Sequence, residues 1–294
     1  MKIAVMGANS SVGLNLLAHV AASEDLDVMA GVRSKRAADL VPASPRITSR
    51  LISYDDVDDL TASLEGVSCV VHLAGILIER RPATYANSNV ATAAAVAEAA
   101  RRAGVGHVVL VSVIGASPDS PNRYFRSKAE AERVVAESGV SSTVLRTPIL
   151  LGPGTAGAAS IVRVVGLGHA KLLGGGRYTM RPLDVDDLSR AILGVCRRQP
   201  GGTAVHELVG PESLTFRELL ARAASVAGKD MRFGVTPIWM AKLGAGIASF
   251  MQGGGMSPTV IDVITADEVV EKNADWELDI TLTSLSDTLQ KILT

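Results

Sequence analysis

The sequence has few cysteines and no excess of either charge, and each shortage excludes a class of protein. Lys and Arg total 29 and Asp and Glu total 30, which gives a formal net charge of -1, and the basic residues are scattered along the chain. The sequence therefore predicts no binding to nucleic acid. The two cysteines, Cys69 and Cys196, both lie in apolar patterns, which indicates buried free thiols and neither a disulfide nor a metal pair.

Long apolar runs and metal-ligand spacings are also missing. No uninterrupted apolar run reaches the roughly 18 residues of a membrane-spanning helix, and the first residues make a poor secretory signal. We therefore expect a cytoplasmic protein without an integral membrane segment. The histidines are scattered without the spacing of metal ligands, so no metal site is expected, and the GxSxG motif of serine hydrolases is absent from the sequence.

What the sequence does have is a regular alternation of apolar runs and amphipathic segments. Residues 2–7, 67–75 and 107–115 are typical of buried strands, and a segment with helical spacing follows each of them. This pattern predicts an α/β fold in which residues 1–150 form a doubly wound parallel sheet that is covered on both faces. Loops separate the later helical stretches, so residues 151–294 are expected to form a smaller C-terminal α/β lobe, partly interleaved with the first domain.

The first turn between a strand and a helix, GANSSVG, has the form of a dinucleotide-binding loop with one departure. Gly7 would permit the tight turn and Gly13 the close packing of helix on strand, while Ser10 replaces the middle glycine with a small side chain whose hydroxyl can bond a phosphate oxygen. An incidental turn is the alternative. The residues predicted to hold the cofactor here are Gly7, Asn9, Ser10, Ser11, Val12 and Gly13.

Tyr124 and Lys128 are four residues apart, which places both side chains on one face of a predicted helix. An ammonium beside a phenol favours the phenolate, so we expect Lys128 to lower the pKa of Tyr124 from its usual value of about 10. A tyrosine tuned in this way can exchange a proton with a carbonyl oxygen while a nicotinamide exchanges hydride with the carbon. The alternative is a helix start with a solvated lysine.

The chain resembles the short-chain dehydrogenase/reductase superfamily in its extended or atypical, epimerase/dehydratase-like form. The motifs MGANSSVG, VVHLAG, YFRSK, STVLRTPILLGPG and RPLDVDDLSRAI follow one another in that family's order, over nearly the whole chain. The segments YFRSKAEAE and TFRELLARAASVAGK are most similar to the NAD(P)H-binding group that includes the 39 kDa subunit of respiratory complex I. The resemblance implies a Rossmann fold and a nicotinamide cofactor.

The resemblance also implies catalytic roles for single residues. It makes Tyr124 the general acid/base and Lys128 its partner, which also bonds the nicotinamide ribose. Ser112 is the nearest match to the family's carbonyl-orienting hydroxyl, although the family often has that hydroxyl one or two residues later, and a hydroxyl that caps the strand end is an equal alternative. Asn89 matches the family's helix asparagine near the active site, with a helix N-cap as the alternative.

Five further residues resemble cofactor contacts of the family. Ala74 and Gly75 match the small residues that lie against the cofactor ribose, and Asp55 matches the acidic residue beside the adenine. Thr147 and Pro148 match the segment that borders the nicotinamide. Tight packing or the end of a strand is the alternative at Ala74, Gly75 and Pro148.

The end of the second predicted strand carries the choice of cofactor. Arg33 stands there, followed by Lys35 and Arg36, where an NAD-specific site usually has an acidic residue. A guanidinium can hold the 2'-phosphate of NADP(H) by paired hydrogen bonds. The sequence therefore favours NADP(H) over NAD(H), and a solvated cluster of charges is the alternative.

Together these features predict an NADP(H)-dependent oxidoreductase acting on a small carbonyl or alcohol. A non-catalytic NAD(P)H-binding structural or sensor protein and a nucleotide-sugar epimerase or dehydratase are the alternatives, and a homodimer or a protein partner is left open. The apolar stretch 236–256 is expected to be a buried helix of the small lobe, with a lid or a surface that meets a membrane or a partner as alternatives.

Overall fold

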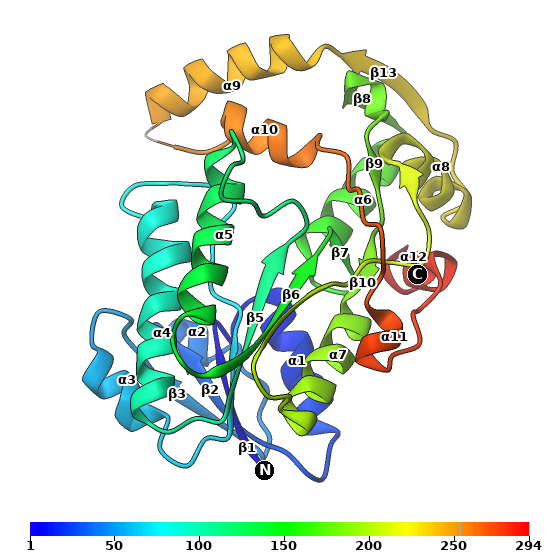
Figure 1. Ribbon diagram of the computed structural model, residues 1–294. Coiled ribbons are helices and arrows are strands. Elements are labelled where there is room, and N and C mark those ends of the chain that lie inside the picture. Colours follow the sequence, from blue (N-terminus) through cyan, green and yellow to red (C-terminus); the bar gives the residue numbers. More distant parts are fainter. Residues whose placement is uncertain (253, 294) are drawn as a thin grey trace.

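A parallel sheet of seven strands forms the centre of the computed structural model, which describes residues 1–252 and 254–293 (Figure 1). The strand order is β11-β6-β5-β4-β1-β2-β3. The order runs outward in opposite directions from β1 and β4, so ligands are expected at the carboxyl ends of these two strands. The strands are β1 (Lys2–Met6), β2 (Asp27–Val32), β3 (Ile47–Leu51), β4 (Cys69–His72), β5 (His107–Val113), β6 (Ser141–Thr147) and β11 (Thr203–Glu207).

Helices cover both faces of this sheet, as the apolar runs predict. Ile3 and Val5 of β1 pack with α1 (Ser11–Ala21) and α7 (Val185–Arg198) on one face. Ala4 and Met6 face the opposite way, toward α3 (Val57–Ser63), α4 (Ala91–Arg102) and α5 (Arg123–Ala136). Because successive side chains of a strand point to opposite faces, a strand buried on both sides must be apolar throughout. The predicted doubly wound α/β fold is confirmed.

The second lobe packs above the carboxyl ends of the strands (Figure 1). Its own apolar core joins α6 (Ala156–Leu167), α8 (Phe216–Val226) and α12 (Leu285–Leu293).

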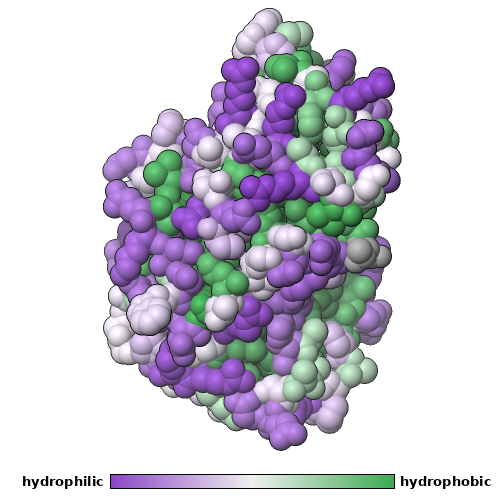
Figure 2. Space-filling view, turned by 90° about the vertical axis from the view of Figure 1, so that its right-hand side faces the viewer, coloured by the Kyte–Doolittle hydropathy of each residue, from purple (hydrophilic) through white to green (hydrophobic). Residues whose placement is uncertain are grey.

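On the side shown in Figure 2, hydrophobic residues form separate patches among hydrophilic ones. The remaining short elements are α2 (Lys35–Ala38), β7 (Leu150–Leu151), β8 (His169–Leu173), β9 (Thr179–Met180), β10 (Leu183–Asp184), β12 (Leu214–Thr215), β13 (Arg232–Thr236), α10 (Pro258–Ile264) and α11 (Asp275–Leu278).

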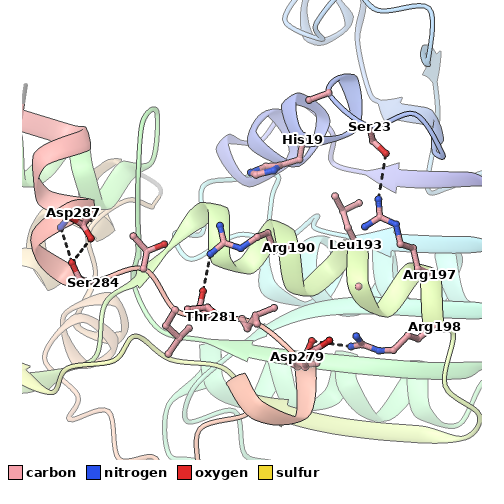
Figure 3. A pocket seen from close by; sticks show the side chains of 16 residues that line it. His19, Ser23, Arg190, Leu193, Arg197, Arg198, Asp279, Thr281, Ser284 and Asp287 are labelled. Atoms are coloured by element: carbon pink, nitrogen blue, oxygen red, sulfur yellow. Dashed lines mark hydrogen bonds between the residues drawn. The ribbon is translucent and has the colours of Figure 1, made fainter.

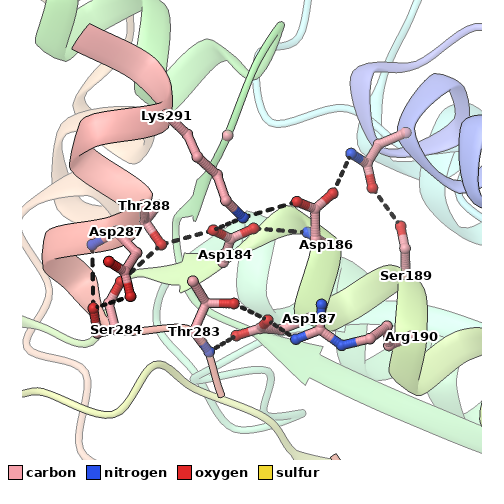
Figure 4. Close-up of polar contacts among 12 residues, drawn as sticks. Asp184, Asp186, Asp187, Ser189, Arg190, Thr283, Ser284, Asp287, Thr288 and Lys291 are labelled. Atoms are coloured by element: carbon pink, nitrogen blue, oxygen red, sulfur yellow. Dashed lines mark hydrogen bonds and ion pairs between the residues drawn. The ribbon is translucent and has the colours of Figure 1, made fainter. Parts of the chain in front are cut away.

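Two buried aspartates fasten the C-terminal segment to the start of α7 (Figure 4). Asp184 caps α7 and accepts hydrogen bonds from Thr288 at 2.7 Å and Lys291 at 3.0 Å. Asp187 accepts from the Thr283 backbone nitrogen at 2.8 Å and from the Thr283 hydroxyl at 2.7 Å. A carboxylate is stabilised near the positive end of a helix, and here it also joins two distant parts of the chain.

The two cysteines meet in the core. Cys69 on β4 and Cys196 on α7 are fully buried free thiols whose sulfur atoms are 3.4 Å apart. The prediction of buried free thiols is confirmed, although the sequence gives no sign that they are neighbours. In the described part of the chain, no cluster of three or more His, Cys, Asp or Glu side chains is arranged to hold a metal ion.

Within the apolar stretch 236–256, of which Gly253 lies outside the described residues, Ile238–Gln252 form α9, and the structure corrects our expectation of a buried helix. Trp239, Leu243 and Ile247 leave 68%, 62% and 58% of their surface exposed. The physical reason is the orientation of the helix, because the partly buried Ala241, Ala245 and Gly246 lie on its inner side. Within residues 1–252 and 254–293, no helix combines the length and apolarity needed to span a membrane.

Candidate active site

A cleft of about 630 Å³ opens at the carboxyl ends of the strands around β1. It lies at the position where doubly wound sheets bind ligands. Seven of the residues predicted to hold a cofactor form part of its wall, namely Gly7, Asn9, Ser10, Arg33, Asp55, Ala74 and Gly75. Ser11, Val12 and Gly13 begin α1 behind the loop, and Lys128, Thr147 and Pro148 lie outside the wall of this cleft.

The two glycines of the first loop are held where a side chain does not fit. Gly7 has a φ of +81°, and a Cβ atom there would lie 3.1 Å from the backbone nitrogen of Ala74. A Cβ atom at Gly13 would lie 2.5 Å from the carbonyl oxygen of Ala8, because α1 packs closely on the turn after β1. This geometry fits a backbone that approaches a pyrophosphate, with the N-terminus of α1 available to its negative charge.

Ser10, the residue in place of the middle glycine, is the N-cap of α1. Its hydroxyl oxygen accepts a hydrogen bond from the backbone nitrogen of Gly13 at 3.0 Å. A hydroxyl that accepts one bond still has its own proton to donate. Since Ser10 also lines the cleft, it can cap the helix and donate to an anion in the cleft at the same time.

The far wall of the cleft contains residues that the sequence analysis missed. Tyr54 lines it, and burial raises the pKa of Tyr54 to about 12 although the nearby positive charge of Arg33 opposes the shift. The edge of His72 meets the Tyr54 ring, with the ring centres 6.1 Å apart. Burial, helped by the charge of Lys128, lowers the pKa of His72 to about 3. His72 is therefore neutral at physiological pH. The sequence did carry a signal for Tyr54, because this residue directly precedes Asp55, which was predicted to contact the cofactor.

Tyr124 and Lys128 are both buried on one face of α5. Asn122 begins this helix by accepting from the backbone nitrogen of Tyr124 at 2.9 Å. The Tyr124 ring lies 5.7 Å from the Tyr85 ring, and the Lys128 ammonium donates to the carbonyl oxygen of Val111 at 3.0 Å. The predicted placement of Tyr124 and Lys128 on one helix face is confirmed by the structure.

The pKa of Tyr124 moves in the direction opposite to our expectation. Burial raises it, and the neighbouring Tyr85 adds to the increase. Lys128 does not lower the pKa of Tyr124, and its ammonium is bonded to the carbonyl oxygen of Val111. Burial lowers the pKa of Lys128 to about 8, although the charge of Glu132 opposes the shift. Tyr124 is therefore a protonated phenol at neutral pH, which suits the donation of a proton.

Gly75 is the point where the cleft meets Lys128. A Cβ atom at Gly75 would lie 3.8 Å from the Lys128 nitrogen and 3.1 Å from the side-chain oxygen of Asn89. Asn89, in the π-helix η1 (Ala86–Val90), accepts from the backbone nitrogen of Ile76 at 2.7 Å and donates to the Ser127 hydroxyl at 3.0 Å. Asn89 therefore ties the loop after β4 to α5 and is not a helix N-cap. Single π-helical turns often occur at functional sites.

Ser112, near the end of β5, bonds to Glu132, which lies one helix turn beyond Lys128 on α5. Its hydroxyl donates to the carboxylate of Glu132, which also accepts from Arg146 at 2.7 Å. The position two residues later is Ile114, which is buried and has no hydroxyl. Thr147 closes β6 beside this group, and its hydroxyl donates to the carbonyl oxygen of Ser112 at 3.3 Å.

A larger cavity, of about 1040 Å³, lies between α1, α7 and residues 278–287 (Figure 3). None of the residues predicted to bind a cofactor lines it. Its guanidinium groups already have partners. Arg197 donates to Asp25 at 2.8 Å, Arg198 to the carbonyl oxygen of Leu278 at 3.2 Å, and Arg190 to that of Thr281 at 3.0 Å. These bonds hold protein groups together and leave the smaller cleft as the candidate nucleotide site.

Comparisons with known proteins identify the family of the chain. A family model described as NAD(P)H-binding matches residues 7–171. NADH dehydrogenase [ubiquinone] 1 alpha subcomplex subunit 9 of Arabidopsis thaliana is 27% identical over 74% of this chain. The chain spans 58% of the length of that relative. Quinone oxidoreductase 2 of Escherichia coli is 26% identical over 79% of this chain and 76% of its own length.

Among solved structures, MoeE5 in complex with UDP-glucose and NAD has the same fold. Its TM-score is 0.78 at 20% identity, with 100% of this chain and 97% of that chain covered. At this identity the likeness establishes the fold alone.

Proposed function

Because this chain belongs to the NAD(P)H-binding family, we propose that it is a cytoplasmic NADP(H)-dependent oxidoreductase that reduces a small carbonyl compound, quinones included. The observation that carries the proposal is the pair Tyr124 and Lys128, buried on α5 directly beyond Gly75 of the nucleotide cleft. The quinone oxidoreductase among its relatives supports the choice of acceptor.

The residues of the cleft fit a dinucleotide. Gly7 and Gly13 leave no room for side chains where backbone would approach a pyrophosphate. Ser10 would donate to a phosphate oxygen, Ala74 and Gly75 would lie against a ribose, and Asp55 would accept from the adenine. We propose that Arg33, exposed at the end of β2, holds the 2'-phosphate and so selects NADP(H).

The bound nicotinamide would supply the hydride, and the chain would supply the proton and the positioning. Tyr124 would donate its phenolic proton to the carbonyl oxygen, a role that suits its raised pKa. Lys128 would hold the ribose and place a positive charge beside the developing phenolate. Thr147 and Pro148 would border the nicotinamide. Ser112, whose hydroxyl is bonded to Glu132, would fix α5 against β5 or, after turning, orient the carbonyl.

A titration of the purified protein with NADPH and NADH tests the cofactor proposal. Replacing Arg33 by Ala should weaken NADPH binding by about tenfold to a hundredfold, the size expected for loss of a charged hydrogen bond, and should leave NADH binding nearly unchanged. Arg36→Ala is the matched control, since Arg36 does not line the cleft. Equal losses in both variants, or no NADPH binding by the wild type, would contradict the proposal.

A non-catalytic NAD(P)H-binding protein is the second candidate. The bond from Ser112 to Glu132 and the apolar side chain of Ile114 favour it, because no free hydroxyl is presented at the end of β5. Screening quinones, aldehydes and ketones for NADPH oxidation separates the two. Tight NADPH binding without turnover of any acceptor, unchanged by Tyr124→Phe, would favour the non-catalytic protein.

A further inference from the structure

The helix α9 presents its large apolar side chains to solvent. Trp239, Leu243 and Ile247 follow one another at intervals of four residues and are all more than half exposed, as is Met240. Residues at this spacing form one continuous stripe on a helix. A stripe of large apolar side chains on the outside of a protein marks an interaction surface.

The side of α9 that faces α10 carries mainly small residues. Ala241, Gly244, Ala245 and Ala248 line an apolar cavity of about 380 Å³ together with Ile261 of α10. Ala241 and Ala245 are partly buried there, whereas Trp239, Leu243 and Ile247 face away from the protein. Lys242, the one charged residue in the α9 sequence, forms an ion pair with Asp262 of α10.

Two unpaired cations lie beside the end of this helix. Arg80 forms an isolated β-bridge with Gly254, and the backbone nitrogen of Gly255 donates to the carbonyl oxygen of Glu79 at 3.0 Å. Arg80 and Arg81 are both exposed, and among the described residues neither guanidinium has a side-chain or backbone partner. The apolar stripe is thus bordered by positive charge that nothing in this part of the protein neutralises.

We propose that α9, together with Arg80 and Arg81, docks the protein on an anionic lipid surface. Figure 1 shows α9 as the outermost element, with α10 lying between it and α5. An outermost helix of this kind can insert its apolar side chains at the boundary between headgroups and acyl chains, while Arg80 and Arg81 bind lipid phosphates. Trp239 has the amphipathic ring that is favoured at this depth.

The charges also argue against a second copy of the chain as the occupant. In a two-fold dimer the same patch meets itself. The arginines of one copy would then face a surface that carries the same unpaired arginines, and like charges would lie close together without compensation. An anionic lipid surface complements the patch, and another copy does not.

Docking would bring the nucleotide cleft close to the lipid. Pro82 and Ala83, which line the cleft, directly follow Arg81 in the chain. The mouth of the cleft would therefore open near the surface on which the protein rests, within reach of acceptors dissolved in the lipid.

Sedimentation of the full chain with vesicles tests the proposal. The protein should pellet with vesicles of phosphatidylcholine mixed with phosphatidylglycerol and much less with phosphatidylcholine alone. The double variant W239S/L243S should lower the partition coefficient on the anionic vesicles by about tenfold or more. The double variant R80Q/R81Q should lower it by about thirtyfold. The matched controls are Trp276→Ser, which alters a tryptophan that is 90% exposed on α11, and R101Q/R102Q at the C-terminal end of α4.

A second measurement uses the same vesicles. The sequence has two tryptophans, so in the variant Trp276→Phe the emission reports on Trp239 and should shift to the blue when anionic vesicles are added. Circular dichroism checks that each variant is folded. No pelleting of the wild type, equal pelleting of W239S/L243S, or a dimer in light scattering that this variant abolishes without any vesicle binding, would each overturn the proposal.

Discussion

Lys128 donates its ammonium to the carbonyl oxygen of Val111 at 3.0 Å, and so it is held at the end of β5 rather than against the Tyr124 phenol. Burial lowers the pKa of Lys128 to about 8, although the charge of Glu132 opposes the shift. The charge on this lysine is therefore sensitive to mildly alkaline pH, whereas the raised pKa of Tyr124 keeps the phenol protonated there.

The rate of carbonyl reduction should fall as the pH rises through about 8. The lysine loses its positive charge in that range, and the developing phenolate then lacks a neighbouring cation. A pH profile of kcat for the wild type and for Lys128→Arg measures the effect. Because a guanidinium stays charged, the fall in kcat should move to higher pH in the variant. If kcat falls at the same pH in the wild type and in Lys128→Arg, the titration of another group causes the fall.

The same pKa shift predicts how stability depends on pH. A lysine with a pKa of about 8 in the folded protein and its ordinary 10.5 in the unfolded chain binds more protons when unfolded between these values. Its contribution to the free energy of unfolding should therefore rise with pH across that range. Urea unfolding of the wild type and of Lys128→Met at both ends of the range measures the difference, and equal slopes would contradict the buried lysine.

Tyr124→Phe should lower turnover by about a hundredfold to ten-thousandfold, the usual contribution of a proton donor, while NADPH affinity changes little. Ser112→Ala should lower turnover by less than about tenfold and should mainly reduce stability, because the Ser112 hydroxyl is bonded to Glu132. Steady-state kinetics and thermal unfolding of the two variants separate these effects. A loss in Ser112→Ala as large as that in Tyr124→Phe would make Ser112 a carbonyl-orienting residue.

Gly13→Ala should destabilise the protein by about 1–3 kcal/mol, because the new methyl group has to displace α1 from the turn after β1. It should also weaken binding of NADPH. The matched control is Gly166→Ala in α6, where a Cβ atom meets nothing within 4 Å. That variant should be more stable by about 0.5–1 kcal/mol, since alanine favours a helix over glycine. Urea unfolding measures both changes.

Asp187→Asn should cost about 1–3 kcal/mol of unfolding free energy, because the fully buried carboxylate accepts two hydrogen bonds from Thr283 and pairs with Arg190. Asp275→Asn, at the start of α11, serves as the control, because its carboxylate has no hydrogen bond or ion pair with the described residues, and it should change stability by less than about 0.5 kcal/mol. If both variants unfold at the same urea concentration, the contacts of Asp187 do not stabilise the packing of the C-terminal segment on α7.

The features that sequence predicted well are those that depend on local constraints. The roles of Gly7 and Gly13 follow from a short strand, a turn and a helix, and the structure places each backbone against a neighbour that excludes a side chain. The fold class likewise follows from apolar runs that must be buried on both faces.

The features that sequence did not predict depend on which distant groups become neighbours. The pKa of Tyr124 was expected to fall because Lys128 is four residues away, and it rises because burial beside Tyr85 matters more. His72, on β4, lies behind the wall of the cleft and contacts Tyr54, which follows β3 in the chain. The direction of α9 could not be deduced from its composition, since a helix that is apolar all round has no inner face until its neighbours are known.

The strand β11 has a consequence for the order in which the chain can fold. Thr203–Glu207 pair with Ser142–Arg146 of β6, and α7, which precedes β11, covers the outer side of β4 and β1. A fragment that ended at residue 150 would leave β6 as an open edge and would uncover the part of one sheet face that α7 covers. During synthesis the nucleotide-binding sheet is thus completed only after residue 207 has left the ribosome, and the two lobes should unfold as one cooperative unit.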